Sequence, residues 1–271
     1  MNAACSVAKT YEDIVALAHT RVGAIVIGSV TLDERDGGPE PRWFSADNFA
    51  LNAFSLPNGG REYYQAHLPD MTKIIHAAGK KAILSIAGFN ADEYAQLAAL
   101  AEESGADIIE VNLGCPHAFV DGKQKPVDSF NRPYMGEVIS RISKVTDLPI
   151  TAKLSPYSNP HELAQVAETM KDLSVAAVVT SNVFANAYML DNGNVVLANE
   201  FGGMSGRALQ PIAMGQVRQF SNLLDIPIIG VGGIESIHDV SLFRQAGASA
   251  VQAATLIVRD GYGAIDRLIE A

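Results

Sequence analysis

Cys115 and Asn112 lie three residues apart in the stretch Asp-Ile-Ile-Glu-Val-Asn-Leu-Gly-Cys-Pro-His, residues 107–117. The first half of this stretch is apolar and β-branched, as in a short buried strand, and Pro116 prevents a regular continuation. A thiol just past the end of a strand, beside an amide side chain, could transfer a proton to or from a small polar substrate. The alternative is a structural cysteine, because free cysteines are among the most buried residues.

Small residues that follow two other apolar runs could bind a phosphate. Gly232 and Gly233 come after one run, Thr255 follows the next, and residues 202–206 read Gly-Gly-Met-Ser-Gly. Backbone N–H groups without neighbouring side chains, gathered at the ends of strands, can form a phosphate cradle. The alternative is that these glycines only allow tight turns.

A lysine and three asparagines are placed where a ligand could contact them. Lys153 ends an apolar run and needs either an anion or a polar ligand, unless its side chain extends to the rim. Asn52, Asn112 and Asn182 could hold an uncharged heterocycle, although a single asparagine is more often a turn or capping residue. His117 could be a base or a structural histidine. The six histidines are scattered and give no ligand framework, so no metal site is predicted.

Apolar runs alternate with amphipathic windows along the whole chain. The predicted strands are residues 1–4, 24–29, 82–87, 107–113, 150–154, 177–182, 227–231 and 250–254. The predicted helices are residues 11–20, 91–103, 135–146, 160–173, 211–224 and 237–246. Eight strands alternating with helices favour a (β/α)₈ TIM barrel, a single α/β domain over residues 1–271, over an open doubly wound sheet.

Two segments are too long to be plain loops of such a barrel, residues 31–67 and residues 184–207. Both follow predicted strands at their carboxyl ends. We therefore expect both insertions to lie over the same barrel face as Cys115, which is the face where barrel enzymes build their sites.

Composition excludes several classes of function. The net charge of −10 argues against nucleic acid or an anionic membrane as the main partner. Two cysteines, Cys5 and Cys115, provide neither a disulfide framework nor ligands for an iron–sulfur cluster. No apolar run approaches the roughly 20 residues of a membrane span, and the first residues lack the features of a signal peptide. These features predict a cytoplasmic enzyme.

Over nearly its whole length the chain resembles the dihydroorotate dehydrogenase family, flavin enzymes built on a (β/α)₈ barrel. Residues 112–116 resemble the family's Asn-Leu-Ser-Cys-Pro motif, whose cysteine is the catalytic base, and residues 52–58 resemble its substrate loop. The resemblance implies that Cys115 takes the C5 proton of dihydroorotate while the C6 hydride passes to flavin N5. The implied substrate residues are Asn52, Leu56, Asn112, His117 and Asn182. The implied FMN residues are Ala3, Ala4, Ser29, Asn112, Lys153, Ser205, Gly206, Gly232, Gly233, Ala254 and Thr255.

The chain departs from the family pattern at three residues and at its start. Gly28 stands where the family carries a lysine, and Cys5 replaces a glycine near the flavin. His117 replaces an asparagine, and dihydropyrimidine dehydrogenases similarly have Cys-Pro-His. The sequence begins at the first barrel strand, without the short extension that usually precedes it. The alternatives are therefore a flavin oxidoreductase acting on another dihydropyrimidine or cyclic substrate, and a flavin- or phosphate-binding barrel without catalysis.

The resemblance also suggests how the enzyme is assembled and reoxidised. Fumarate suits a self-contained enzyme as electron acceptor, whereas NAD would require a partner chain that carries an iron–sulfur cluster. A homodimer is implied. We also expect the Cys115 thiol to keep a pKa near the ordinary value of about 8.5, so that it works as a base at mildly alkaline pH.

Overall fold

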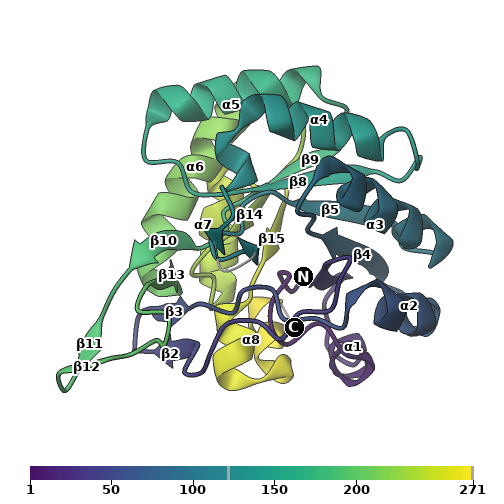
Figure 1. Cartoon of the computed structure of the whole chain (residues 1–271). Coiled ribbons are helices and arrows are strands. Elements are labelled where there is room, and N and C mark those ends of the chain that lie inside the picture. Colours follow the sequence, from purple (N-terminus) through teal and green to yellow (C-terminus); the bar gives the residue numbers. More distant parts are fainter. Residues whose placement is uncertain (121–122, 270–271) are drawn as a thin grey trace.

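The computed structural model describes residues 1–120 and 123–269. Its centre is a parallel sheet with strand order β1-β4-β5-β8-β9-β14-β15, curled into a barrel (Figure 1). The strands are β1 (Ala24–Val30), β4 (Lys81–Ile86), β5 (Ile108–Asn112), β8 (Ile150–Leu154), β9 (Ala177–Thr180), β14 (Ile228–Val231) and β15 (Ala250–Gln252). Each lies within a residue or two of a predicted strand, because parallel strands buried on both faces read as short continuous apolar runs.

The N-terminal residues fill the place of the eighth strand, although only a single bridge forms there. The Ala3 N–H donates to the Ala253 carbonyl (2.8 Å), and the Ala253 N–H donates to the Met1 carbonyl (3.1 Å). On the other side the buried Asn2 side chain donates to the Val26 carbonyl (2.7 Å) and accepts from the Val26 N–H (3.0 Å). The seam between β15 and β1 is thus joined by backbone on one side and by a side-chain amide on the other.

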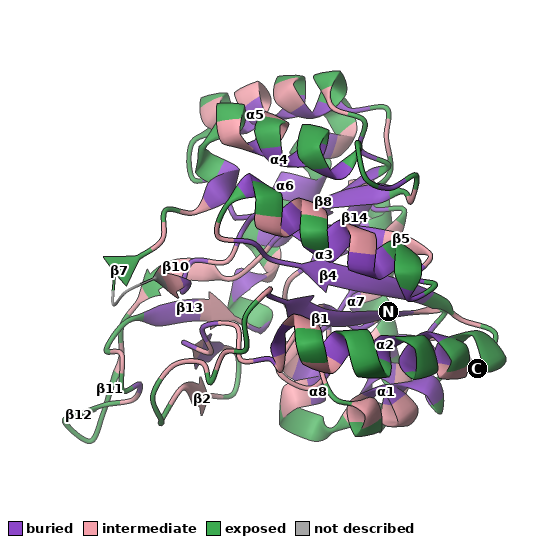
Figure 2. Ribbon diagram, turned by 45° about the vertical axis from the view of Figure 1, so that its right-hand side comes forward, coloured by how far each residue is buried: buried purple, intermediate pink, exposed green. Residues whose placement is uncertain are grey.

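Helices surround the barrel with their apolar faces turned inward, as the purple stripes of α3, α4 and α5 show in Figure 2. They are α1 (Tyr11–Ala18), α2 (Gly60–Ala77), α3 (Ala91–Glu103), α4 (Arg132–Ile142), α5 (Pro160–Asp172), α6 (Gln210–Leu223), α7 (Ile237–Ala246) and α8 (Thr255–Asp260). The 3₁₀ segments are η1 (Asp128–Phe130), η2 (Arg207–Leu209) and η3 (Tyr262–Leu268). No helix in the described ranges is both long and apolar enough to cross a membrane.

Helix α2 was not predicted, and it corrects the far boundary of the first insertion. Residues 60–67, assigned to that insertion, are the first half of the helix. Pro69 lies inside it and obscured the pattern, because proline normally ends a helix. The helix forms because Tyr64, Leu68, Met71 and Ile75 recur at helical spacing and are completely buried.

The two insertions meet in a four-stranded antiparallel sheet with the order β10-β13-β3-β2, which lies at the left of the barrel in Figure 1. The first insertion supplies β2 (Trp43–Ser45) and β3 (Ala50–Asn52), and the second supplies β10 (Phe184–Ala187) and β13 (Gly202–Ser205). Asn52 pairs with Gly203 and Ala50 with Ser205. The small hairpins are β6 (Phe119–Val120) with β7 (Lys123–Gln124) and β11 (Leu190–Asp191) with β12 (Asn194–Val195).

Candidate active site

Two adjoining cavities lie where the barrel strands end. Every predicted site residue lines one of them. The first cavity is lined by Ala4, Ser29, Asn52, Leu56, Asn112, Cys115, His117, Lys153, Asn182, Ser205, Ala254 and Thr255. The second adds Ala3, Gly206, Gly232 and Gly233. Lys153, Asn182, Ser205 and Thr255 are among the residues common to both, so the two form one continuous site.

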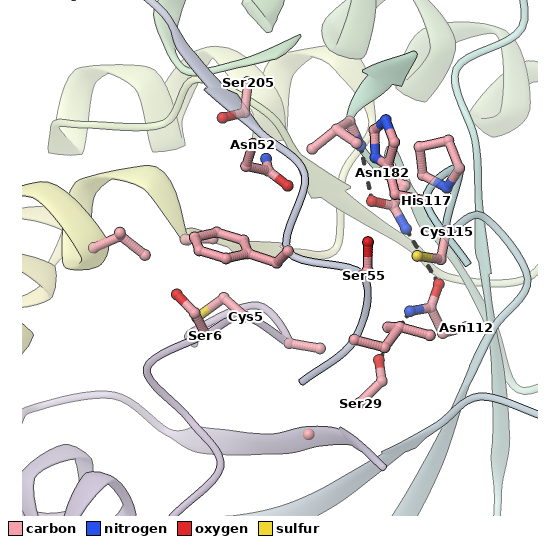
Figure 3. A pocket seen from close by; sticks show the side chains of 18 of the residues that line it. Cys5, Ser6, Ser29, Asn52, Ser55, Asn112, Cys115, His117, Asn182 and Ser205 are labelled. Carbon is pink, nitrogen blue, oxygen red and sulfur yellow. Dashed lines mark hydrogen bonds between the residues drawn. The ribbon is translucent and has the colours of Figure 1, made fainter. Parts of the chain in front are cut away.

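Asn112 links three strand ends through its side-chain amide. Its Nδ2 donates to the Ser29 hydroxyl (2.8 Å), and its Oδ1 accepts from Nδ2 of Asn182 (3.1 Å). Figure 3 shows this amide pair at the cavity wall. The Asn182 Oδ1 accepts from the Val183 N–H (2.9 Å), which fixes the orientation of the amide. Asn112 therefore positions Asn182, and both present polar edges to a ligand.

The Cys115 sulfur points into the same cavity (Figure 3). Burial raises the pKa of the Cys115 thiol above its ordinary value. A hydrogen bond from the His117 backbone and the positive charges of Lys9, Lys125 and Arg35 oppose this shift only in part. The expectation of an ordinary thiol pKa was therefore wrong, because the sequence does not show how completely the insertions cover the cavity.

Lys153 does not extend to the rim. Its side chain is buried, and its ammonium lies 3.4 Å from Oε1 of Glu110, which is also buried. The other Glu110 oxygen accepts from Nε2 of Gln252 (2.7 Å). This buried ion pair holds Lys153 where it lines both cavities. Glu110 was missed in the sequence, although an acid in the middle of an apolar strand signals a buried partner.

The second cavity contains the predicted cradle. Gly206, Gly232 and Gly233 all have positive φ, and within the described part of the chain their N–H groups donate no hydrogen bond. A Cβ at Gly233 would lie 2.8 Å from the Gly206 carbonyl oxygen, so the glycines keep this space open. The Thr255 hydroxyl donates to that of Ser205 (3.0 Å). Free N–H groups and hydroxyls of this kind fit a phosphate.

His117 is neutral at physiological pH, since burial lowers its pKa to about 4. A neutral imidazole can donate and accept hydrogen bonds but is a weak base. Its position on the cavity wall fits ligand binding better than proton abstraction.

Other lining residues were not singled out in the sequence. Trp43 stacks on Phe54, with ring centroids 5.8 Å apart. Lys9 extends into the cavity from the segment before α1. Neither Lys9 nor Trp43 directly follows a barrel strand, so the residues at the strand ends could not have revealed them. Among the described residues, no cluster of His, Cys, Asp and Glu is arranged to hold a metal ion.

A thiol next to paired amides, continuous with a glycine-lined cradle at the carboxyl end of a (β/α)₈ barrel, fits the class of barrel enzymes that bind a small polar substrate beside a phosphate-bearing group. Comparison with known proteins narrows this class. The family model for dihydroorotate dehydrogenase matches residues 1–271, and the chain belongs to this family of oxidoreductases.

The similar proteins include dihydroorotate dehydrogenases of two types. The chain is 34% identical over 241 residues to the catalytic subunit of dihydroorotate dehydrogenase B (NAD(+)) of Thermoplasma volcanium, covering 89% of this chain and 76% of that protein. The Pyrococcus furiosus protein of the same name is 35% identical over 92% of this chain and 79% of its own length. The dihydroorotate dehydrogenase (fumarate) of Saccharomyces paradoxus is 30% identical over 99% of this chain and 86% of its own length.

Proposed function

We propose that this protein oxidises dihydroorotate to orotate in pyrimidine biosynthesis, using FMN as its cofactor. The observation that carries the proposal is the continuity of the two cavities: Cys115 and the Asn112–Asn182 amides line one end, and the glycine cradle lines the other. The membership in a family of dihydroorotate dehydrogenases supports the substrate.

Enzymes of this family are flavoproteins, and FMN is the flavin that fits this site best. Its single phosphate would lie on the free N–H groups of Gly206, Gly232 and Gly233 and on the Thr255 hydroxyl. Lys153, fixed by Glu110, would contact the ring system between the two cavities. When bound, FMN supplies the acceptor for the hydride.

The residues of the first cavity would hold the substrate and remove its proton. Asn52, Asn112 and Asn182 carry the donors and acceptors that match the imide edge of a dihydropyrimidine ring. Leu56 and His117 complete the wall. Cys115, as the thiolate, takes the proton from C5, and its thiol must then release that proton before the next turnover.

Fumarate is the electron acceptor that we propose. The two cysteines of the chain both line the cavity, so this chain provides no iron–sulfur ligands, and the use of NAD would require a partner chain that carries the cluster. Reoxidation by fumarate requires no further chain. Mixing the substrate-reduced protein with fumarate under anaerobic conditions tests this, and flavin that stays reduced in the presence of fumarate would contradict it.

The first experiment is an absorbance spectrum of the purified protein followed by anaerobic addition of dihydroorotate. A flavin spectrum that bleaches supports both cofactor and substrate. A second candidate substrate, a dihydropyrimidine without the carboxylate, is favoured by the neutral His117 on the cavity wall. Bleaching by dihydrouracil but not by dihydroorotate would establish that alternative, and a protein without flavin would contradict both.

A further inference from the structure

Lys9 places an ammonium group in the substrate cavity without an acidic partner. Its Nζ donates to the Pro57 carbonyl. In residues 1–120 and 123–269, no carboxylate lies within ion-pair distance of this ammonium. The acid nearest in sequence, Asp13, is engaged elsewhere, because its Oδ2 accepts from the N–H groups of Lys9 and Thr10 and its Oδ1 from the Tyr262 hydroxyl. An ammonium has three donors, so two remain for a ligand.

The surroundings of Lys9 make an unpaired cation costly. Burial lowers the pKa of Lys9 to about 8, so it is still mainly charged at neutral pH. The groups that favour its charged form are led by the thiols of Cys5 and Cys115, which are themselves largely neutral because burial raises their pKa. A half-buried charge without a fixed counter-ion, such as that of Lys9, is stabilised when an anionic ligand provides one.

The loop beside Lys9 offers further donors to an anion. Ser55 and Leu56 both have positive φ (59°), and both line the cavity. Within the described residues, the N–H groups of Phe54, Ser55 and Leu56 donate no hydrogen bond. They immediately precede Pro57, whose carbonyl holds the Lys9 ammonium. A cation and consecutive free N–H groups on one wall form a site for a carboxylate.

Gly28 could not supply this cation. It has φ +109°, and a Cβ there would lie 2.6 Å from the Ser85 carbonyl oxygen and 2.8 Å from the Val30 nitrogen. Its N–H donates to the Ala8 carbonyl (2.8 Å) and so fixes the backbone just before Lys9. The position that carries a lysine in the family is closed to side chains here, and a lysine from a neighbouring segment reaches the same cavity.

We propose that Lys9 is a specificity-determining residue that binds the carboxylate of the substrate and selects an anionic dihydropyrimidine over an uncharged one. This inference rests on the proposed function. Dihydroorotate differs from dihydrouracil by its carboxylate, and in this proposal Lys9 recognises that carboxylate.

The test measures binding of two ring-matched ligands, orotate and uracil, to the flavin-loaded protein by isothermal titration calorimetry. In Lys9→Gln, orotate binding should weaken by roughly 10- to 100-fold, the range for losing a hydrogen bond to a charged group, while uracil binding stays within about twofold. Lys80→Gln is the matched control, because Lys80 also donates to a single backbone carbonyl, that of Ala18 (2.8 Å), but does not line the cavity. It should leave both affinities unchanged.

The outcomes separate this inference from the proposed function. Unchanged orotate affinity in Lys9→Gln, with wild-type protein still bleached by dihydroorotate, would overturn the role of Lys9 alone. An equal loss of orotate and uracil affinity would also overturn it, since Lys9 would then only shape the cavity. Wild-type protein that binds uracil but not orotate would overturn both. Lys9→Arg, which keeps the charge, should retain part of the preference for orotate.

Discussion

The Lys153 ammonium lies 3.4 Å from Oε1 of Glu110 inside the barrel, and both side chains are almost completely buried. Neither charge has access to bulk water, so each depends on the other. Removing one partner of such a pair leaves the other charge uncompensated, which costs more than the pair contributes.

We therefore expect Glu110→Gln to lower the free energy of unfolding by about 3–5 kcal/mol. Urea denaturation of flavin-free protein measures this. Glu168→Gln is the control, because Glu168 pairs with Lys171 at 2.8 Å on the exposed surface of α5, where loss of a pair costs about 1 kcal/mol or less. An equal loss of unfolding free energy in the two variants would contradict this prediction, because it would show that Lys153 does not need Glu110 as a counter-ion.

Cys115→Ala should keep its flavin but slow its reduction by dihydroorotate by roughly 10²- to 10⁴-fold, the usual contribution of a base. Anaerobic stopped-flow absorbance measures the rate. Cys5→Ala is the control: it removes the other thiol that lines the cavity, and its flavin should be reduced at close to the wild-type rate. The same loss in both variants would contradict the assignment of Cys115 as the base.

The rate of flavin reduction should depend on pH. Because burial raises the pKa of Cys115, little thiolate is present at neutral pH, and its fraction grows as pH rises. We expect the rate at saturating dihydroorotate to increase with pH and to level off only above the ordinary thiol pKa of about 8.5. Stopped-flow traces across this range test it, and a profile that is flat in wild-type protein would refute the prediction.

Gly233→Ala should release flavin, because its Cβ would approach the Gly206 carbonyl oxygen to 2.8 Å and would push the Gly206 side of the cradle out of place. Gly79→Ala is a matched control with a similar positive φ (72°) but open space around its Cβ. Gly79→Ala should lose about 1 kcal/mol of stability from backbone strain, and Gly233→Ala should lose more because its Cβ also clashes with the backbone. Only Gly233→Ala should show a lower ratio of flavin to protein absorbance, and full retention of flavin in it would argue against the cradle.

Asn2→Ala should open the barrel seam. The change removes both hydrogen bonds to Val26 and leaves a buried N–H and a buried carbonyl without partners, which should cost about 2 kcal/mol or more. Thermal unfolding measures the loss. Asn194→Ala, in the exposed β11–β12 hairpin, should change stability by no more than about 0.5 kcal/mol. A similar effect at both positions would mean that Asn2 does not hold the seam.

The barrel strands could be predicted because each is a continuous apolar run, and Cys115, Asn182, Gly232 and Thr255 could be placed at the cavity because each comes soon after such a run. Contacts between distant segments could not be predicted. The Glu110–Lys153 pair depends on how strands are staggered around the barrel, and Lys9 reaches the cavity from a segment with no periodic pattern. Helix α2 was hidden by Pro69. The pKa of Cys115 is raised because the two insertions cover the cavity, and no local sequence pattern shows how far they cover it.

The pairing of β3 with β13 joins parts of the chain that are about 150 residues apart, and it places Asn52 of the substrate wall in the same ladder as Ser205 beside the cradle. The four-stranded sheet therefore connects the two ends of the site, and we expect these ends to move together. We expect a phosphate bound beside Ser205 to order the strand that carries Asn52 as well. Cofactor binding and substrate affinity would then be thermodynamically linked, and each would strengthen the other by the same factor.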